Sequence, residues 1–136
     1  MVAEKIKMTM ADVRLEYTRL SDLVREKKLF AGEVNLAIAK NNIVLENQVK
    51  LFNDCIDKLV ERYAAKDASG KPQVKNNMYV FETAESEKAY REAVTEQEKT
   101  EIEMEIQTVK ADALIDEKHD EPTAKDLVAL IFMIKD

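Results

Sequence analysis

Three observations in the sequence predict an α+β fold, with four helices packed on a small sheet of about three strands. Apolar side chains recur every seventh residue in a proline-free stretch at about 31–66, which places them on one face of a helix. Residues 101–109 begin with alternating acidic and apolar side chains, as in a strand with one wet face. The chain has only two Gly and two Pro, so tight turns are few. The alternative is an all-helical bundle in which the strand-like pieces are extended loops.

The very long central helix, at about 31–66, organises the rest of the prediction. It exceeds the usual helix of a small domain, so other elements or a second copy must pack along it. Asn41 and Asn42 interrupt its apolar stripe, where a polar residue either fixes packing register or faces solvent. The seven-residue apolar stripe and the apolar run at 127–134 together predict a homo-oligomer. The candidate interface residues are Ile38, Leu45, Phe52, Leu59, Leu130 and Phe132.

The N-terminal third predicts one strand and one helix. Residues 4–10 alternate between apolar and polar side chains, which favours a short strand. Thr9 and Asp12 have the spacing of a helix cap. The following helix is expected at about 10–27, and the cations at its end suit the helix dipole.

Shorter patterns predict the remaining elements. Residues 78–81 form an aromatic run typical of a second strand, and Thr83 begins a thin amphipathic helix on the surface. Residues 101–109 are the third strand, and a loop with His119 follows. Thr123 and Asp126 have capping-box spacing. The next eight residues, 127–134, are all apolar, so we expect a helix buried on several sides, in the core and partly in an interface.

Length and composition limit the class of protein. The 136 residues predict a single domain, 1–136. The net charge is −6, and from Phe81 onward 16 Asp/Glu stand against 7 Lys/Arg, so we expect no direct nucleic-acid binding. Cys55 is the only cysteine and no apolar run reaches the length of a membrane span. These features indicate a protein of the cytoplasm that needs no membrane.

The sequence has no recognisable catalytic site. Neither a glycine-rich phosphate loop nor a nucleophile–base pair has the required spacing, and the Gly70-Lys71 pair lacks the rest of a phosphate-loop motif. His119 has no second His or Cys nearby, so it is no metal site by itself. We expect a non-enzymatic protein with neither a cofactor nor a metal.

The order of motifs resembles a family of small proteins from tailed phages and prophages of mainly Gram-positive bacteria. The features that carry the resemblance are the Lys-Ile-Lys strand, the long helix ending in the turn 66–72, the Tyr-Val-Phe strand, the alternating acidic strand and the Thr-Ala-Lys-Asp-Leu helix. The family has no agreed function. The resemblance covers about residues 4–134 and implies a phage protein that works in the host cytoplasm.

This resemblance implies an accessory protein that counters host defence, and two mechanisms fit the residues. In the first, an oligomer sequesters a nucleotide second messenger of the immune response, with cations holding the phosphates and aromatic rings stacking on the base. In the second, an acidic surface docks onto a basic host defence protein. The candidates for the first are Arg14, Arg19, Arg25, Lys27, Lys28, Lys71, Lys75, Tyr17, Tyr79 and Phe81; for the second they are Glu101, Glu103 and Glu105.

An alternative function fits the long helix and the apolar C-terminal run equally well. The protein is then a phage morphogenesis factor, either an assembly protein or a tail chaperone. Neither function requires catalysis.

Overall fold

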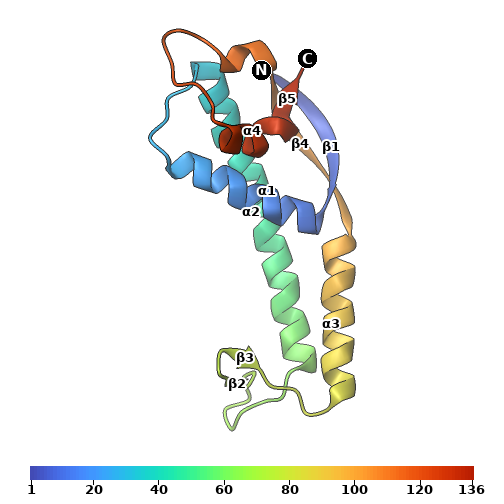
Figure 1. Cartoon of the computed structure of the whole chain (residues 1–136). Helices are drawn as coiled ribbons and strands as arrows, with labels where there is room; N and C mark the ends of the chain where they lie inside the picture. Colours follow the sequence, from blue (N-terminus) through green and yellow to red (C-terminus); the bar gives the residue numbers. More distant parts are fainter. The chain divides into compact units, whose positions relative to one another are not determined.

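A computed structural model describes all residues, 1–136, and has the predicted α+β class (Figure 1). The sequence predicts one domain, and the folded chain divides into two compact units. The first, here called the sheet unit, comprises Met1–Val49 and Glu101–Asp136. The second, the hairpin unit, comprises Lys50–Thr100. The long helix α2, Gly32–Tyr63, begins in the sheet unit and ends in the hairpin unit.

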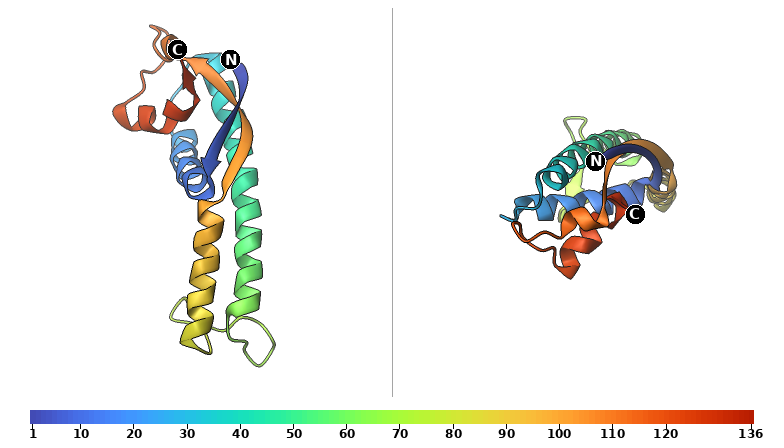
Figure 2. Two further views of the ribbon diagram at one scale, coloured as in Figure 1. Left: turned by 90° about the vertical axis from the view of Figure 1, so that its right-hand side faces the viewer. Right: turned by 90° about the horizontal axis from the view of Figure 1, so that it is seen from above.

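The sheet unit contains a three-stranded sheet with the order β1-β4-β5. β1, Val2–Thr9, pairs antiparallel with β4, Glu101–Lys110, and the two strands curve together side by side (Figure 2). β5, Ile134–Lys135, pairs parallel with the end of β4. The predicted alternation in β4 is confirmed, because Met104 and Ile106 are buried while Glu103 and Glu105 are exposed.

The first helix, α1, occupies Met10–Arg25, close to its predicted bounds. The Thr9 hydroxyl accepts a hydrogen bond from the backbone N–H of Asp12 at 3.2 Å, as the capping pattern predicts. Such a cap stabilises a helix by about 1 kcal/mol. The inner face of α1 carries Val13 and Leu20, both fully buried, and the C-terminal helix packs against α1.

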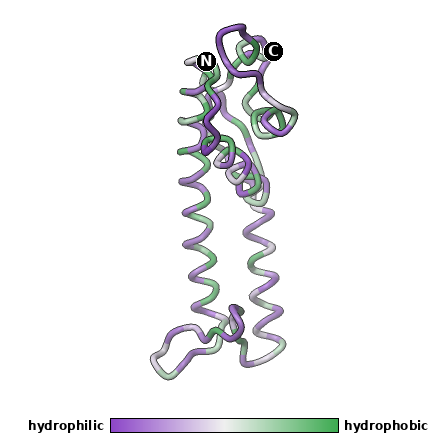
Figure 3. Tube along the Cα trace, turned by 60° about the vertical axis from the view of Figure 1, so that its left-hand side comes forward, coloured by the Kyte–Doolittle hydropathy of each residue, from purple (hydrophilic) through white to green (hydrophobic).

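The predicted long helix is confirmed, and its apolar stripe faces the interior. Apolar positions recur turn after turn along α2 (Figure 3). In the sheet unit, Val34, Ile38 and Leu45 are buried on this stripe. Asn41 is also fully buried there and its side-chain amide is hydrogen-bonded to the backbone of Gln107 in β4. Asn41 therefore fixes the position of the helix along the strand, one of the two roles that the sequence left open.

The C-terminal run differs from its prediction. The Thr123–Asp126 capping box is present, and α4 begins at Ala124 as expected, but it ends at Leu130. Ile131–Met133 form a 3-10 turn, and the chain then continues into β5. The expected helix over 127–134, buried on several sides, is therefore wrong. Leu130 and Met133 are fully buried, whereas Leu127, Val128 and Ile131 are exposed.

The hairpin unit joins the second half of α2 to α3, Ala84–Lys99, and the two helical segments lie side by side (Figures 1 and 2). The Thr83 cap is confirmed, since its hydroxyl accepts from the N–H of Ser86 at 3.0 Å. No residue of α3 is fully buried, as its thin apolar stripe predicts.

The connection between these helices contains a second, separate sheet. β2, Val74–Lys75, and β3, Met78–Tyr79, form a β-hairpin. Its two-residue turn consists of Asn76 and Asn77, whose φ angles are 53° and 62°. The strand predicted at 78–81 exists, but it pairs with β2 and does not join β1 and β4. β3 pairs with β2, its neighbour in sequence, because the two successive positive φ angles between them reverse the direction of the chain within two residues.

Candidate functional site

The ten ligand candidates do not come together in one unit. Six of them lie on or just after α1 in the sheet unit, and four lie on the connection between α2 and α3 in the hairpin unit. The first group is Arg14, Tyr17, Arg19, Arg25, Lys27 and Lys28; the second group is Lys71, Lys75, Tyr79 and Phe81.

Carboxylates of the same unit neutralise part of the first group. The Arg25 guanidinium lies 3.0 Å from the carboxylate of Asp22 on the preceding turn. Lys28 bonds Asp126 at the start of α4, and its ammonium also lies 3.7 Å from Glu26. Phosphate recognition needs donors that remain available for the ligand. This arrangement therefore gives little support to a phosphate site at the end of α1.

The Lys28–Asp126 pair has a structural role. Asp126 is 2% exposed, and it also accepts from the backbone N–H of Thr123 at 2.9 Å, which completes the capping box. Burial alone would raise the pKa of Asp126, but hydrogen bonds from Lys28 and Thr123 outweigh it and lower this pKa below its usual range. The hydrogen bond to Asp126 raises the pKa of Lys28. The pair therefore stays charged and ties the segment after α1 to α4.

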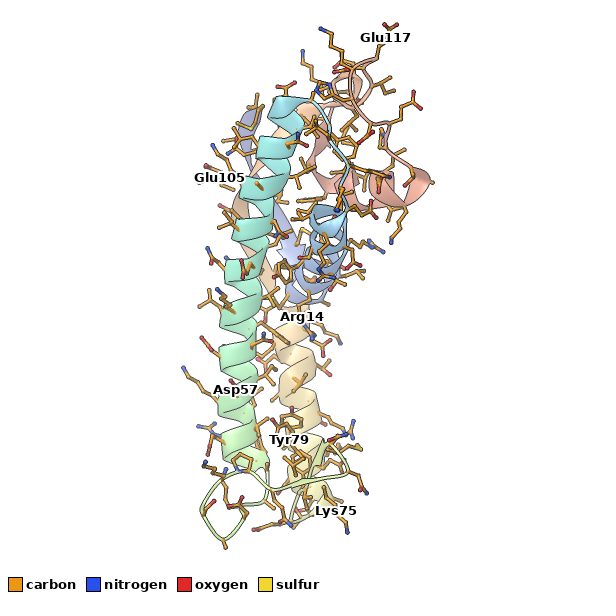
Figure 4. All side chains as sticks on the ribbon, turned by 90° about the vertical axis from the view of Figure 1, so that its left-hand side faces the viewer. Arg14, Asp57, Lys75, Tyr79, Glu105 and Glu117 are labelled. Carbon is orange, nitrogen blue, oxygen red and sulfur yellow. The ribbon has the colours of Figure 1, made fainter.

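The second group partly converges on one face of the hairpin unit. Tyr79 and Phe81 line a cavity of about 230 Å³ together with Asn77, Met78, Glu87, Tyr90 and Arg91. The rings of Phe81 and Tyr90 have centroids 5.2 Å apart. Arg91 is paired with Glu87 at 2.9 Å. Figure 4 shows Lys75 and Tyr79 on the hairpin, but neither Lys75 nor Lys71 lines this cavity.

The turn before the hairpin is structural. One carboxylate oxygen of Asp67 accepts from the N–H and the hydroxyl of Ser69 and from the N–H of Lys71. These bonds, led by the Ser69 hydroxyl, lower the pKa of Asp67. Gly70 has a φ of 83°, which favours glycine. The Asp67 carboxylate thus occupies backbone N–H groups that a phosphate loop would offer to its ligand. This agrees with the absence of a phosphate-loop motif in the sequence.

The acidic strand face is less acidic than its sequence indicates. Glu101, Glu103 and Glu105 are all exposed on one face of β4. The neighbouring strand β1 places Lys5 opposite Glu105 and Lys7 opposite Glu103. Lys5 also lies 3.8 Å from Glu103 on the diagonal. Cross-strand cations therefore balance much of this charge.

Four of the six interface candidates are buried within the chain itself. Ile38, Leu45 and Phe52 of α2 are at most 7% exposed, and Leu130 of α4 is fully buried. Leu59 and Phe132 are half-buried. A side chain in the chain's own core is not offered to a second copy, so the seven-residue spacing reflects internal packing.

An exposed apolar surface near the C-terminus was not predicted. It is here called the C-terminal apolar surface and consists of Ile115, Leu127, Val128 and Ile131, which are 69%, 42%, 49% and 71% exposed. Ile115 and Leu127 also line a cavity of about 290 Å³, and Ile131 follows Leu127 by one helical turn. The cavity is lined by Ala111, Leu114, Ile115, Glu121, Pro122, Leu127 and Ile134. The sequence signal is the apolar run 127–134, for which the sequence predicts a place in the core and partly in an interface.

Charged side chains of both signs are close in sequence to this surface. Glu121 lines the cavity, whereas Asp112 lines a separate one together with Lys110 and Lys135. Glu117 lies at the outer end of the loop before α4 (Figure 4). The other loop carboxylates are satisfied: Asp116 contacts His119 Nδ1 at 2.6 Å, which lowers the pKa of Asp116, and Asp120 accepts from the N–H of Leu29.

One further titratable group is buried. Glu16 of α1 is 5% exposed, and its Oε2 atom has no hydrogen-bond partner. Burial raises its pKa to about 7, although the positive charge of Arg19 opposes this shift. No cavity is lined by Glu16 among those described above. Its burial affects stability and does not by itself indicate a ligand.

The search for metal sites and membrane spans, and the comparisons with known proteins, do not identify a function. No group of three His, Cys, Asp or Glu side chains is arranged to hold a metal ion. No helix has the length and apolarity needed to cross a membrane. The chain matches no protein-family model, and no curated protein or solved structure is similar to it.

Proposed function

We propose that this chain is a non-enzymatic binding protein that acts on a protein partner through the C-terminal apolar surface. The observation that carries the proposal is the large exposed fraction of Ile115, Leu127, Val128 and Ile131, of which Ile115 and Leu127 line an apolar cavity. Contiguous exposed apolar surface rimmed by polar residues is typical of protein–protein interaction sites. Interfaces of this kind have an apolar centre and a polar rim.

Two biological roles are consistent with such a surface. In the first, the protein counters host defence by occupying a defence protein in the cytoplasm of the host. In the second, it is a phage morphogenesis factor that holds a virion protein during assembly. Sequestration of a nucleotide second messenger receives less support, because Arg25 and Lys28 already bind carboxylates.

Site-specific crosslinking in phage-infected cells tests the proposal. A photoreactive phenylalanine analogue replaces Ile131, which is 71% exposed, so the substitution removes little packing. We expect one dominant crosslinked protein, which mass spectrometry identifies. A host protein supports the counter-defence role, and a virion protein supports the morphogenesis role.

The matched control places the same analogue at Lys88, an exposed position on α3 in the hairpin unit. Equal crosslinking from both positions, or none from position 131, contradicts the proposal. The substitution Leu127→Glu adds a second check, because it places a charge in the middle of the surface and should abolish the crosslink from position 131.

A further inference from the structure

We propose that a proton on the Glu16 carboxyl group controls the contact between α1 and α4. With the proton bound, the two helices pack together. When the proton is lost, α4 and the turn after it separate from α1, while the hairpin unit stays folded. The observation that carries the proposal is the Oε2 atom of Glu16, which is buried without a hydrogen-bond partner. The inference concerns the chain alone, whether or not the C-terminal apolar surface binds a protein.

The surroundings of Glu16 suit a neutral group. Glu16 is 5% exposed, and it follows Val13 by three residues and precedes Leu20 by four, so the three side chains share one face of α1. Val13 and Leu20 are fully buried. An ionised carboxylate on this face loses hydration without gaining a hydrogen bond, which disfavours the charged form. Burial accordingly raises the pKa of Glu16 to about 7.

No charged group of the neighbouring elements supplies the missing partner. Arg19, on the next turn of α1, is exposed, and its charge favours ionised Glu16 without outweighing burial. The other elements of the sheet unit that lie around α1 are α4, β1, β4 and the first part of α2. Their charged side chains are exposed, half-buried or already bound, and they are Lys125 and Asp126 on α4, Glu4, Lys5 and Lys7 on β1, Glu101, Glu103, Glu105 and Lys110 on β4, and Glu33, Lys40 and Glu46 on α2.

α4 is the element whose displacement requires the fewest broken pairings. It has seven residues, packs against α1 and leads through Ile131–Met133 into β5, which has two residues. The strand that also packs on α1 is β1, and its eight residues, Val2–Thr9, all pair with β4. Segments with few pairings open at a lower free energy than long ladders do. Water therefore reaches Glu16 through opening of α4.

The start of α4 remains attached during this opening. Asp126 is bound by Lys28, and these contacts lower the pKa of Asp126 and raise the pKa of Lys28. Both groups therefore stay charged at the pH at which Glu16 loses its proton. The open segment is tethered and closes again when the proton returns. Because α4 carries Leu127 and Val128, the opening also alters the C-terminal apolar surface.

The dependence on pH has a definite sign. In the packed state the pKa of Glu16 is about 7, and in the open state it returns to 4.5. Rising pH therefore favours the open state between these two values and has no further effect above them. The two pKa values change the opening equilibrium by about 70-fold between pH 5 and pH 8.

Amide hydrogen exchange of the full chain at pH 5 and pH 8 tests the inference, with each amide normalised to its intrinsic rate. We expect the protection of residues 127–133 to fall by about 70-fold at the higher pH. Amides of α3 in the hairpin unit should change by less than about threefold. Equal protection of residues 127–133 at the two pH values overturns the inference. A similar loss in α3 also overturns it, because the opening is then global.

Two variants assign the effect to Glu16. Glu16→Gln keeps the shape of the side chain without the titrating proton and should remove the pH dependence at residues 127–133. Asp12→Asn, at an exposed position of the same helix, is the matched control and should retain it. His119, in the loop before α4, is present in both variants. A pH dependence that persists in Glu16→Gln therefore belongs to another group and overturns the inference.

Discussion

The side-chain amide of Asn41 forms two hydrogen bonds with the backbone of Gln107. Its Nδ2 donates to the Gln107 carbonyl at 2.8 Å, and its Oδ1 accepts from the Gln107 N–H at 2.7 Å. The side-chain amide of Asn41 thus makes the same pair of hydrogen bonds to β4 that the backbone of an adjacent strand would make. Two residues later, at Val109, β5 takes over the pairing with β4. The Asn41 side chain of α2 and the short strand β5 together provide hydrogen-bond partners for the backbone of this part of β4.

Substituting Asn41→Leu should destabilise the protein by about 2 to 3 kcal/mol, because both backbone groups of Gln107 lose their partner while the side-chain volume is retained. Denaturant unfolding followed by circular dichroism measures the change. Asn47→Leu, at an exposed position of the same helix, should change stability by less than about 0.5 kcal/mol. Equal effects at the two positions would contradict the role of the hydrogen bonds.

Glu16→Gln should stabilise the protein above neutral pH. Burial raises the pKa of Glu16 from 4.5 to about 7, so the folded state binds a proton that the unfolded state releases. The stability of the wild type, relative to the variant, is therefore greatest below pH 4.5 and falls as the pH rises to about 7. The full difference is about 3 kcal/mol.

Urea unfolding of both proteins at half-unit steps from pH 4 to pH 8.5 measures this difference. Glu85→Gln, at an exposed position in the first turn of α3, is the matched control. A stability difference between wild type and Glu16→Gln that does not depend on pH would show that Glu16 stays charged in the folded protein.

Two neighbouring residues of the C-terminal segment should respond in opposite ways. Leu130→Ala should cost about 2 to 5 kcal/mol, because Leu130 is fully buried and leaves a cavity. Ile131→Ala should change stability by less than about 0.5 kcal/mol, because Ile131 is 71% exposed. Thermal unfolding of the two variants provides the comparison. Similar losses at both positions would indicate a continuous buried helix, as the sequence predicts.

The hairpin turn gives a prediction for the second unit. Asn77 has a φ of 62°, which glycine adopts without strain and β-branched residues avoid. Asn77→Gly should therefore leave stability unchanged or raise it slightly, whereas Asn77→Val should lower it by about 1 to 2 kcal/mol. Hydrogen exchange of the amides in residues 64–81 reports on this unit alone. Equal exchange in the two variants would contradict the strain at this position.

Local patterns predicted most of the fold correctly. Helix starts at Thr9, Thr83 and Thr123 depend on a hydroxyl and the next few residues, so the sequence contains the whole signal. The alternation in β4 and the stripe of α2 report directly which side is buried. The register of Val2 with Thr108 has no local signal, because it depends on residues 106 positions apart.

The site was harder to predict than the fold. The apolar run at 127–134 has the same composition whether it is buried or exposed. Its composition therefore does not show that Leu127, Val128 and Ile131 are exposed while Leu130 and Met133 are buried. One contact of the cations near α1 has no local signal either. The ion pair of Lys28 with Asp126 joins residues 98 positions apart.

The pairing of β1 with β4 has a consequence for the order of folding. β1 leaves the ribosome before its partner residues, Glu101–Thr108, which are made about a hundred residues later. The hairpin at 74–79 pairs residues that are close in sequence and forms without this long wait. The N-terminal strand therefore remains without its partner through most of synthesis. Alternating Lys5 and Lys7 keep this waiting segment charged, which opposes its pairing with other nascent chains.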